Sequence, residues 1–367
     1  MIMRTRSIVS ALAAAVLLAA CARAGDPPPA PATTTVSAST RPAEIRRGVE
    51  MTGDSEERTR QYIQRTLAKV EPTGHADVAR LPAYLEFCRR EFVEDTRTFA
   101  FDVSGEPAPA GGIFLRGFVE FPEHQQALEA FFKHLGLPVE RNDVELLPSK
   151  MLGERKYAVV TEPRAFVYDQ PTGGKRETLT ECVAGDELYV LKEADGGQLL
   201  CHAPDGYVGY VDAGAVRRVS QSEFESIAAG VPQRRAADSA KVIEAARPFL
   251  GTKYVWGGVT TGGVDCSGLV RGAYQSIGID LPRDADQQSL VGRLVATRWH
   301  RGNLRPGDTL YFLGRRGTIH HTALYIGDNK YIEATEPVAK ISSFDPASAD
   351  YEAKRDKSFC FGKRILE

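Results

Sequence analysis

The chain has 367 residues, a length typical of two or three domains. Hydrophobic residues make up 43% and charged residues 26% of it, proportions that exclude a disordered or fibrous chain. Its 46 Lys and Arg residues almost balance its 48 Asp and Glu residues, which argues against binding to nucleic acid. The 7 His and 6 Cys residues are scattered without a CxxC pair, so the sequence predicts no zinc-finger array and no other metal or cofactor.

Residues 1–21 are predicted to be a targeting segment rather than part of the fold. Two arginines precede the apolar run Ile8–Ala20, which is too short to cross a membrane and has the length of a signal-peptide core. The run ends in Leu-Ala-Ala-Cys, which resembles a bacterial lipobox, and this resemblance implies a lipid on Cys21. An ordinary signal peptide with a Cys at this place by chance is the other interpretation.

Residues 22–50 follow as a tether rich in Pro, Ala and Thr, a composition that cannot bury a core. No later run reaches the roughly 18 apolar residues of a membrane helix. Ala22, not Asp, follows Cys21, and in Gram-negative lipoproteins Asp at this place resembles a signal for retention in the inner membrane. The resemblance therefore implies a lipid anchor in the outer membrane and a location in the cell envelope facing the periplasm.

Residues 51–153 are predicted to form an α+β region. The spacing of apolar residues predicts helices over 55–70, 81–94 and 122–135, and a strand over 111–121. The region contains no motif that carries chemistry, and its aromatic residues are expected to form a core.

Residues 154–220 alternate short apolar runs with turn pairs, which predicts five or six short strands of a small barrel. Gly185-Asp, Leu188-Tyr-Val-Leu and Gly206-Tyr-Val-Gly-Tyr-Val follow one another in a pattern that resembles a bacterial SH3-like domain. Such a domain would bind wall polymer or shape the substrate groove of a neighbouring enzyme. Cys182 and Cys201 lie on predicted strands here, either as a disulfide or as two small core residues.

Residues 237–367 contain the chemistry. Apolar spacing predicts a helix over 236–249 and a second one over 267–277, directly after Cys266. Backbone N–H groups and the dipole at a helix N-terminus favour a thiolate, and this position predicts a pKa well below that of a free cysteine. The same N–H groups can hold an oxyanion. A small buried cysteine without reactivity is the other interpretation.

A nucleophilic cysteine needs a base, and a predicted β-hairpin supplies one. Its first strand contains His320 and His321, and its second strand contains Glu333. Strand alternation separates the two histidines and places His321 on the same face as Glu333. We predict that Nδ1–H of His321 donates to Glu333 and that Nε2 faces Cys266. A surface hairpin with solvated side chains is the other interpretation.

Five motifs, in order, resemble the NlpC superfamily of papain-like cell-wall peptidases. They are Tyr254-Val-Trp-Gly-Gly, Asp265-Cys-Ser-Gly-Leu, Leu281-Pro-Arg-Asp-Ala-Asp-Gln-Gln, Leu304-Arg-Pro-Gly-Asp and His321-Thr-Ala-Leu-Tyr. The resemblance implies that Cys266 is the nucleophile and His321 the base, with His320 a bystander. That family most often has His as its third polar residue, and this chain departs from it with Glu333.

A barrel ahead of the catalytic domain, together with Tyr254, Asp265 and Arg283-Asp284, resembles more narrowly the γ-D-glutamyl-L-diamino acid endopeptidases. This resemblance implies that peptidoglycan stem peptides or muropeptides with a free L-Ala amine are the substrates. The residues that it implies contact substrate are Tyr254, Asp265, Ser267, Arg283 and Asp284. It also implies a barrel carboxylate for the amine, and Glu177 and Glu181 are the candidates.

We therefore expect a monomeric α+β protein in which a papain-like catalytic domain follows an SH3-like β-barrel and an α+β N-terminal region. Two other functions stay open: wall binding without catalysis, and an amidase or acyltransferase reaction on the same fold. His202 is predicted to lie on a strand surface. The histidines that offer no partner spacing are His75, His124, His134 and His300.

Overall fold

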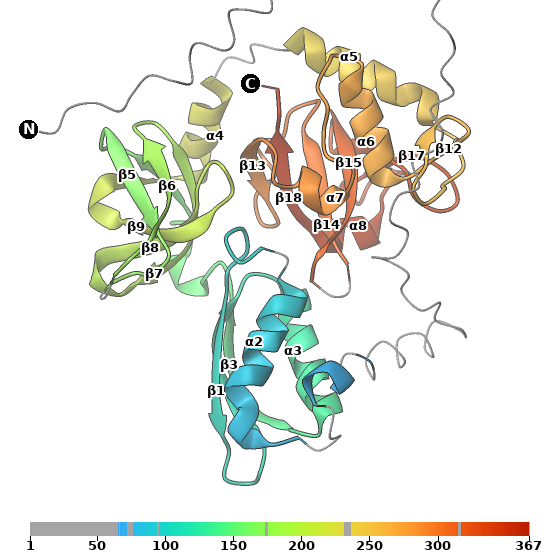
Figure 1. The fold of residues 1–367 in the computed structure, drawn as a ribbon. Helices are drawn as coiled ribbons and strands as arrows, with labels where there is room; N and C mark the ends of the chain where they lie inside the picture. The colour runs from blue at the N-terminus through green and yellow to red at the C-terminus, as the bar shows by residue number, and fades with distance from the viewer. Residues whose placement is uncertain are drawn as a thin grey trace, which may run out of the picture. The chain divides into compact units, whose positions relative to one another are not determined.

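The computed structural model describes residues 65, 67–71, 76–93, 95–172, 175–230, 236–314 and 317–366. The predicted targeting segment with Cys21, the tether, His75 and most of the predicted helix 55–70 lie outside these residues. None of the helices within the described ranges is long and apolar enough to cross a membrane. The described chain has three successive parts, each with its own main sheet (Figure 1).

The first part packs two helices on a three-stranded sheet (Figure 1). The helices are α2 (Leu81–Phe92) and α3 (Pro122–Leu135), and the strands are β1 (Phe101–Pro107), β2 (Ile113–Val119) and β3 (Val139–Leu146). Helix α3 has its predicted bounds because Pro122 stands in its first turn and Gly136, at φ 81°, ends it in the left-handed conformation. The predicted helix 81–94 and strand 111–121 are confirmed with slightly shorter bounds.

The second part is a seven-stranded sheet in the order β10-β4-β7-β8-β9-β5-β6. Its strands are β4 (Tyr157–Val160), β5 (Arg164–Tyr168), β6 (Thr178–Val183), β7 (Glu187–Ala194), β8 (Gln198–His202), β9 (Val208–Asp212) and β10 (Val216–Val219). No ladder joins β10 to β6 among the described residues, so a closed barrel is not formed there. Cys182 and Cys201 are free thiols buried in this part's core, as the core interpretation predicted.

The third part places its helices around a six-stranded sheet in the order β13-β18-β14-β15-β16-β17. These strands are β13 (Arg293–Thr297), β14 (Thr309–Leu313), β15 (Ile319–Gly327), β16 (Lys330–Glu333), β17 (Lys340–Ser343) and β18 (Phe359–Arg364). The helices of this part are α5 (Ala236–Ala246), α6 (Cys266–Gln275), α7 (Ala285–Gln288) and α8 (Ala353–Ser358). Helix α4 (Gln221–Gly230) precedes this part and contacts β4. A short ribbon, β11 (Val259–Thr260) with β12 (Gly263–Val264), comes just before α6.

Short 3-10 turns complete the described elements: η1 (Val78–Arg80), η2 (Lys150–Leu152), η3 (Asp195–Gly197), η4 (Ala213–Ala215) and η5 (Arg247–Phe249). The described chain thus combines α-helices and β-sheets, as the predicted α+β class requires.

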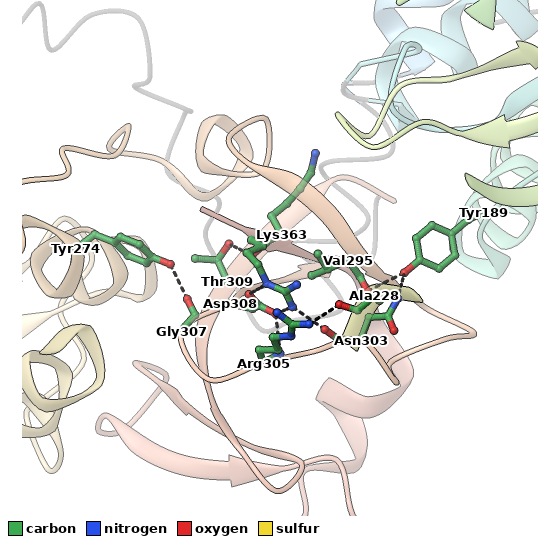
Figure 2. Close-up of polar contacts among 11 residues, drawn as sticks. Tyr189, Ala228, Tyr274, Val295, Asn303, Arg305, Gly307, Asp308, Thr309 and Lys363 are labelled. Atoms are coloured by element: carbon green, nitrogen blue, oxygen red, sulfur yellow. Dashed lines mark hydrogen bonds and ion pairs between the residues drawn. The ribbon is translucent and has the colours of Figure 1, made fainter. Parts of the chain in front are cut away.

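The fourth sequence motif, residues 304–308, builds a buried ionic anchor. Both carboxylate oxygens of Asp308 accept hydrogen bonds from Arg364, at 3.0 and 2.9 Å. The backbone carbonyl of Gly307, a glycine held at φ 98°, accepts a hydrogen bond from the hydroxyl of Tyr274 on α6 (Figure 2). This motif therefore fixes the helix that begins at Cys266 and lies outside the catalytic chemistry.

Several histidines that the sequence left without partners are buried and bonded. His202 is 2% exposed and its Nε2 lies 2.7 Å from Glu120, so the predicted surface position is wrong. Nε2 of His300 lies 3.0 Å from Glu225, and Nε2 of His124 lies 2.9 Å from the carbonyl oxygen of Gly317. Their partners are 75 to 193 residues away along the chain, which is why local spacing did not reveal them.

Candidate active site

Cys266 is the first residue of α6, and Asp265 caps that helix by accepting a hydrogen bond from the backbone N–H of Gly268 at 2.7 Å. The thiol is buried, and the backbone of Thr322 on β15 and that of Ser267 hydrogen-bond to it. Burial dominates these contacts and raises the pKa of Cys266 above its usual value, contrary to the predicted low pKa. The sulfur therefore lies against the strand that carries His321, one residue before Thr322.

His321 and Glu333 meet as a buried pair. Nε2 of His321 lies 2.7 Å from Oε2 of Glu333, whereas His320 is exposed. The ladder pairs Leu324 with Ile332 and thereby places Glu333 one step diagonally from His321, as the hairpin predicted. The predicted ring orientation is wrong: Nε2, and not Nδ1, faces the carboxylate.

Glu333 has two further partners that the sequence analysis missed. Arg355 on α8 donates through Nε to Oε2 at 2.7 Å, and Ser342 on β17 donates its hydroxyl to Oε1 at 2.6 Å. Ser342 could have been found from the pairing of β17 with β16, but Arg355 lies 22 residues beyond Glu333 with no periodic signal. The carboxylate is 1% exposed and has a partner on each oxygen.

These contacts hold the carboxylate charged and the imidazole neutral. Burial opposes the charge of Glu333, but the His321 hydrogen bond, the charge of Arg355 and the Ser342 hydrogen bond together lower its pKa to about 2. Burial, and then the charge of Arg355, lower the pKa of His321 to about 4 against the opposing pull of Glu333. Near neutral pH the site therefore holds a neutral thiol, a neutral imidazole and a carboxylate.

The structure brings together three of the five residues expected to contact substrate. Arg283 donates to both oxygens of Asp265, at 3.0 and 2.6 Å, and to the hydroxyl of Ser267 at 2.9 Å. Asp265 also accepts hydrogen bonds from the backbone N–H groups of Gly257, at 2.8 Å, and of Gly268, at 2.7 Å. The Asp265 carboxylate is therefore already paired with a guanidinium and two backbone amides.

Tyr254 and Asp284 flank this cluster. Tyr254 is half-buried, and burial followed by the charges of Cys266 and Asp265 raises its pKa to about 12, so its hydroxyl stays protonated. Asp284 is the N-cap residue of α7, although its side chain makes no capping hydrogen bond.

Glu177 and Glu181, the carboxylates predicted to bind the substrate amine, lie at β6 of the seven-stranded sheet. Glu181 is paired with Arg164 at 2.8 Å, and Glu177 is exposed. Within the described part of the chain, neither makes a hydrogen bond or ion pair to the cluster around Cys266. The residues that the structure describes contain no group of three or more His, Cys, Asp or Glu side chains that could hold a metal ion.

Residues 251–358 match the model of the NlpC/P60 family. This part of the chain is an NlpC/P60 domain. The match includes Cys266, His321, Glu333 and Arg355, and it begins well after the seven-stranded sheet has ended.

Several curated proteins are similar to longer or shorter stretches of the chain. A gamma-D-glutamyl-L-lysine dipeptidyl-peptidase of Bacillus cereus is 30% identical over 180 residues, 48% of this chain and 49% of that protein. A protein of the same name from Bacillus subtilis is 27% identical over 233 residues, 63% of this chain and 70% of that protein. The murein DD-endopeptidase MepS/murein LD-carboxypeptidase of Escherichia coli is 33% identical over 120 residues, 32% of this chain and 58% of that protein. The chain thus spans about half the length of the first of these relatives.

Solved structures of NlpC/P60 proteins also match part of the chain. An NlpC/P60 family protein from Bacillus cereus matches with a TM-score of 0.31 and 25% identity, covering 59% of this chain and 66% of that one. The NlpC/p60 domain of the peptidoglycan hydrolase SagA matches with a TM-score of 0.28 and 26% identity, covering 34% of this chain and 97% of that one.

Proposed function

We propose that the protein is a papain-like cysteine peptidase that hydrolyses the γ-D-glutamyl–diamino acid bond of peptidoglycan stem peptides. The observation that carries the proposal is Cys266 at the N-terminus of α6, held against the strand of a buried His321–Glu333 pair. The NlpC/P60 match over residues 251–358 and the names of the similar proteins support the reaction class and the bond.

Cys266 acts as the nucleophile and His321 as the base. As the sulfur attacks the carbonyl carbon, Nδ1 of His321 takes the thiol proton, and the backbone N–H groups at the start of α6 stabilise the oxyanion. The imidazolium then gives this proton to the leaving amine, and the acyl group stays on sulfur. Water, deprotonated by His321, releases the γ-D-glutamyl product and restores the thiol.

Glu333 supports both proton transfers. Its carboxylate accepts from Nε2–H of His321 and so fixes the tautomer in which Nδ1 has a free lone pair. It also stabilises the imidazolium that forms in the transition state, in a site where burial strengthens the attraction.

The substrate pocket is built around the Asp265–Arg283 pair. Tyr254, Ser267 and Asp284 complete its wall, and Asp265 receives the free amine of the L-Ala residue. Because Arg283 already neutralises much of the Asp265 charge, we expect a free amine to be preferred over an N-acetylated one by less than about tenfold in kcat/KM.

The rest of the chain places this enzyme at its substrate. We propose that residues 154–220 are an SH3-like domain that contributes to wall binding, and that a lipid on Cys21 anchors the protein in the outer membrane facing the periplasm. The described NlpC/P60 domain supplies all the proposed catalytic groups from one chain, which supports action as a monomer.

Mass spectrometry of products from purified muropeptides tests this function. Release of L-Ala-γ-D-Glu fragments supports the proposal. Separation of glycan from intact peptide would instead identify an amidase, and transfer of an acyl group to an added amine or lipid would identify an acyltransferase. Binding to peptidoglycan without any cleavage would identify a wall-binding protein.

A further inference from the structure

We propose that Arg355 is a positioning residue of the active site, which stabilises the ionised form of Glu333 and holds it oriented toward His321. The inference rests on the proposed function, because it assigns a role within that reaction. It explains how this chain can use a buried carboxylate as the third catalytic group.

The carboxylate of Glu333 is bonded to side chains from three different elements. Its Oε2 lies 2.7 Å from Nε2 of His321 on β15 and 2.7 Å from Nε of Arg355 on α8. Its Oε1 is held by Ser342 at 2.6 Å. Both oxygens are thus fixed, and the carboxylate cannot turn away from the imidazole without breaking a bond to Arg355 or Ser342.

A permanent cation stabilises the charge of a carboxylate at this depth. Burial alone would favour the protonated acid, which would lose the negative charge that stabilises an imidazolium. His321 cannot fill this role because it is neutral before it takes the thiol proton. The guanidinium of Arg355 is charged at every working pH, and it is itself 9% exposed.

Arg355 is held independently of Glu333. Its Nη2 donates to the hydroxyl of Thr335 at 3.2 Å, and its guanidinium lies 5.6 Å from the ring centre of Phe312. The next residue of α8, Asp356, forms a separate ion pair in which Arg301 donates to it at 2.6 Å. That second pair contacts neither His321 nor Glu333 and offers a matched control.

The charges around the catalytic pair predict a pH signature. His321 faces Glu333 and Arg355 and lies beside His320, while Asp265 and Arg355 act on Cys266. The thiol and imidazole lose their protons as a coupled pair, so the pH–rate profile has two limbs. In Arg355→Gln the hydrogen bonds of His321 and Ser342 still hold Glu333 ionised near neutral pH, so loss of the cation makes both protonations easier and moves both limbs to higher pH. Loss of the Glu333 anion moves both limbs to lower pH.

The test compares Arg355→Gln and Arg355→Lys with Asp356→Asn, each measured for kcat, KM and pH profile on a stem peptide. We expect Arg355→Gln to lower kcat about 10- to 100-fold with KM changed less than about threefold, and to raise both limbs by about one pH unit. Arg355→Lys, which keeps the charge, should recover part of kcat and keep both limbs near their wild-type pH. Asp356→Asn should match the wild type in all three measurements.

A double-mutant cycle with Glu333→Gln shows whether Arg355 acts through Glu333. We expect Arg355→Gln to cost less than about threefold in kcat when Glu333 is already Gln. An equal cost in both backgrounds, or unmoved limbs in Arg355→Gln, would overturn the inference. If Arg355→Gln does not fold, Arg355→Lys alone decides. An unchanged kcat in Arg355→Lys would overturn the inference. A kcat lowered about two- to tenfold, with both limbs at their wild-type pH, would support it.

A second readout separates this inference from the proposed reaction. The rate at which iodoacetamide alkylates Cys266 depends on the same coupled titration and needs no substrate. If the wild type cleaves no stem peptide, the proposed function fails, and the opposite shifts of the alkylation profile in Arg355→Gln and Glu333→Gln still test Arg355. Shifts of the same sign, or none, would reject the role of Arg355 whatever the reaction is.

Discussion

Nε2 of His321 lies 2.7 Å from Oε2 of Glu333. Of the two ring nitrogens, the carboxylate therefore binds Nε2, the one farther from Cβ. In the proposed reaction Nδ1 is therefore the nitrogen that serves Cys266, whose sulfur lies near the backbone of the next residue, Thr322. This relation determines which tautomer the reaction needs, with hydrogen on Nε2 and a lone pair on Nδ1.

Replacing Glu333 by Gln keeps a side chain of the same shape and removes its charge. We expect kcat/KM to fall about 5- to 150-fold, which corresponds to roughly 1–3 kcal/mol of transition-state stabilisation. Both limbs of the pH–rate profile should move to lower pH because the imidazole and the thiol lose an anionic neighbour. Steady-state kinetics on a stem peptide from pH 5 to 9 would show both effects, and wild-type kinetics in Glu333→Ala would identify Glu333 as a bystander.

Acid should weaken the fold through the same two groups. His321 has its pKa lowered from 6.5 to about 4, so the unfolded chain binds a proton there first and stability falls as pH drops from 6.5 to 4. Glu333 has its pKa lowered from 4.5 to about 2, and its contribution is lost between those values.

Urea unfolding at pH 7 and pH 5 measures this loss. Between pH 7 and pH 5 we expect the free energy of unfolding of the wild type to fall by on the order of 1–2 kcal/mol more than that of His321→Gln, which lacks the titrating ring. The comparison with a variant is needed because burial also lowers the pKa of His124 and of His300. Equal losses in wild type and variant would show that His321 does not titrate differently on folding.

Asp308 should matter for stability and not for catalysis. Asp308→Ala leaves the buried guanidinium of Arg364 without its carboxylate, and we expect the free energy of unfolding to fall by about 3–5 kcal/mol. The folded fraction should keep kcat within about threefold of wild type, because Asp308 contacts no catalytic group. A loss of kcat at full stability would place residues 304–308 in the active site instead.

Membrane attachment should depend on Cys21. The acyl chains would supply the apolar surface that the Pro-rich tether lacks, at about 0.8 kcal/mol for each buried CH₂ group. Cys21→Ser should therefore move the protein from the membrane fraction to the soluble periplasmic fraction of a Gram-negative host. If Cys21→Ser stays in the membrane fraction, the protein is not attached to the membrane by a lipid on Cys21.

The predictable features were those that neighbouring residues determine. Helix α3 has its predicted bounds because Pro122 and Gly136 mark its ends, and α6 starts at Cys266 because Asp265 caps it. Period-two alternation separated His320 from His321 and placed Glu333 near the buried ring. Each of these follows from residues that are a few positions apart or joined by one tight turn.

The features that sequence reasoning missed depend on distant residues and on burial. Arg355 reaches Glu333 because α8 folds back on the sheet, and no local pattern announces this contact. The low pKa expected of Cys266 considered only the helix N-terminus, whereas the structure buries the thiol and so raises its pKa. The ring orientation of His321 could not be predicted, since both nitrogens are donors or acceptors of the same kind.

The central claim is that the Cys266 thiol cleaves the γ-D-glutamyl–diamino acid bond. The most direct test measures whether Cys266→Ala hydrolyses a defined L-Ala-γ-D-Glu-diamino acid tripeptide. Cys88→Ala, which removes another buried thiol far along the chain, is the matched control. We predict that the wild type and Cys88→Ala release the diamino acid, and that Cys266→Ala, with a wild-type circular dichroism spectrum, releases none. Cleavage by folded Cys266→Ala above a few per cent of the wild-type rate would contradict the account.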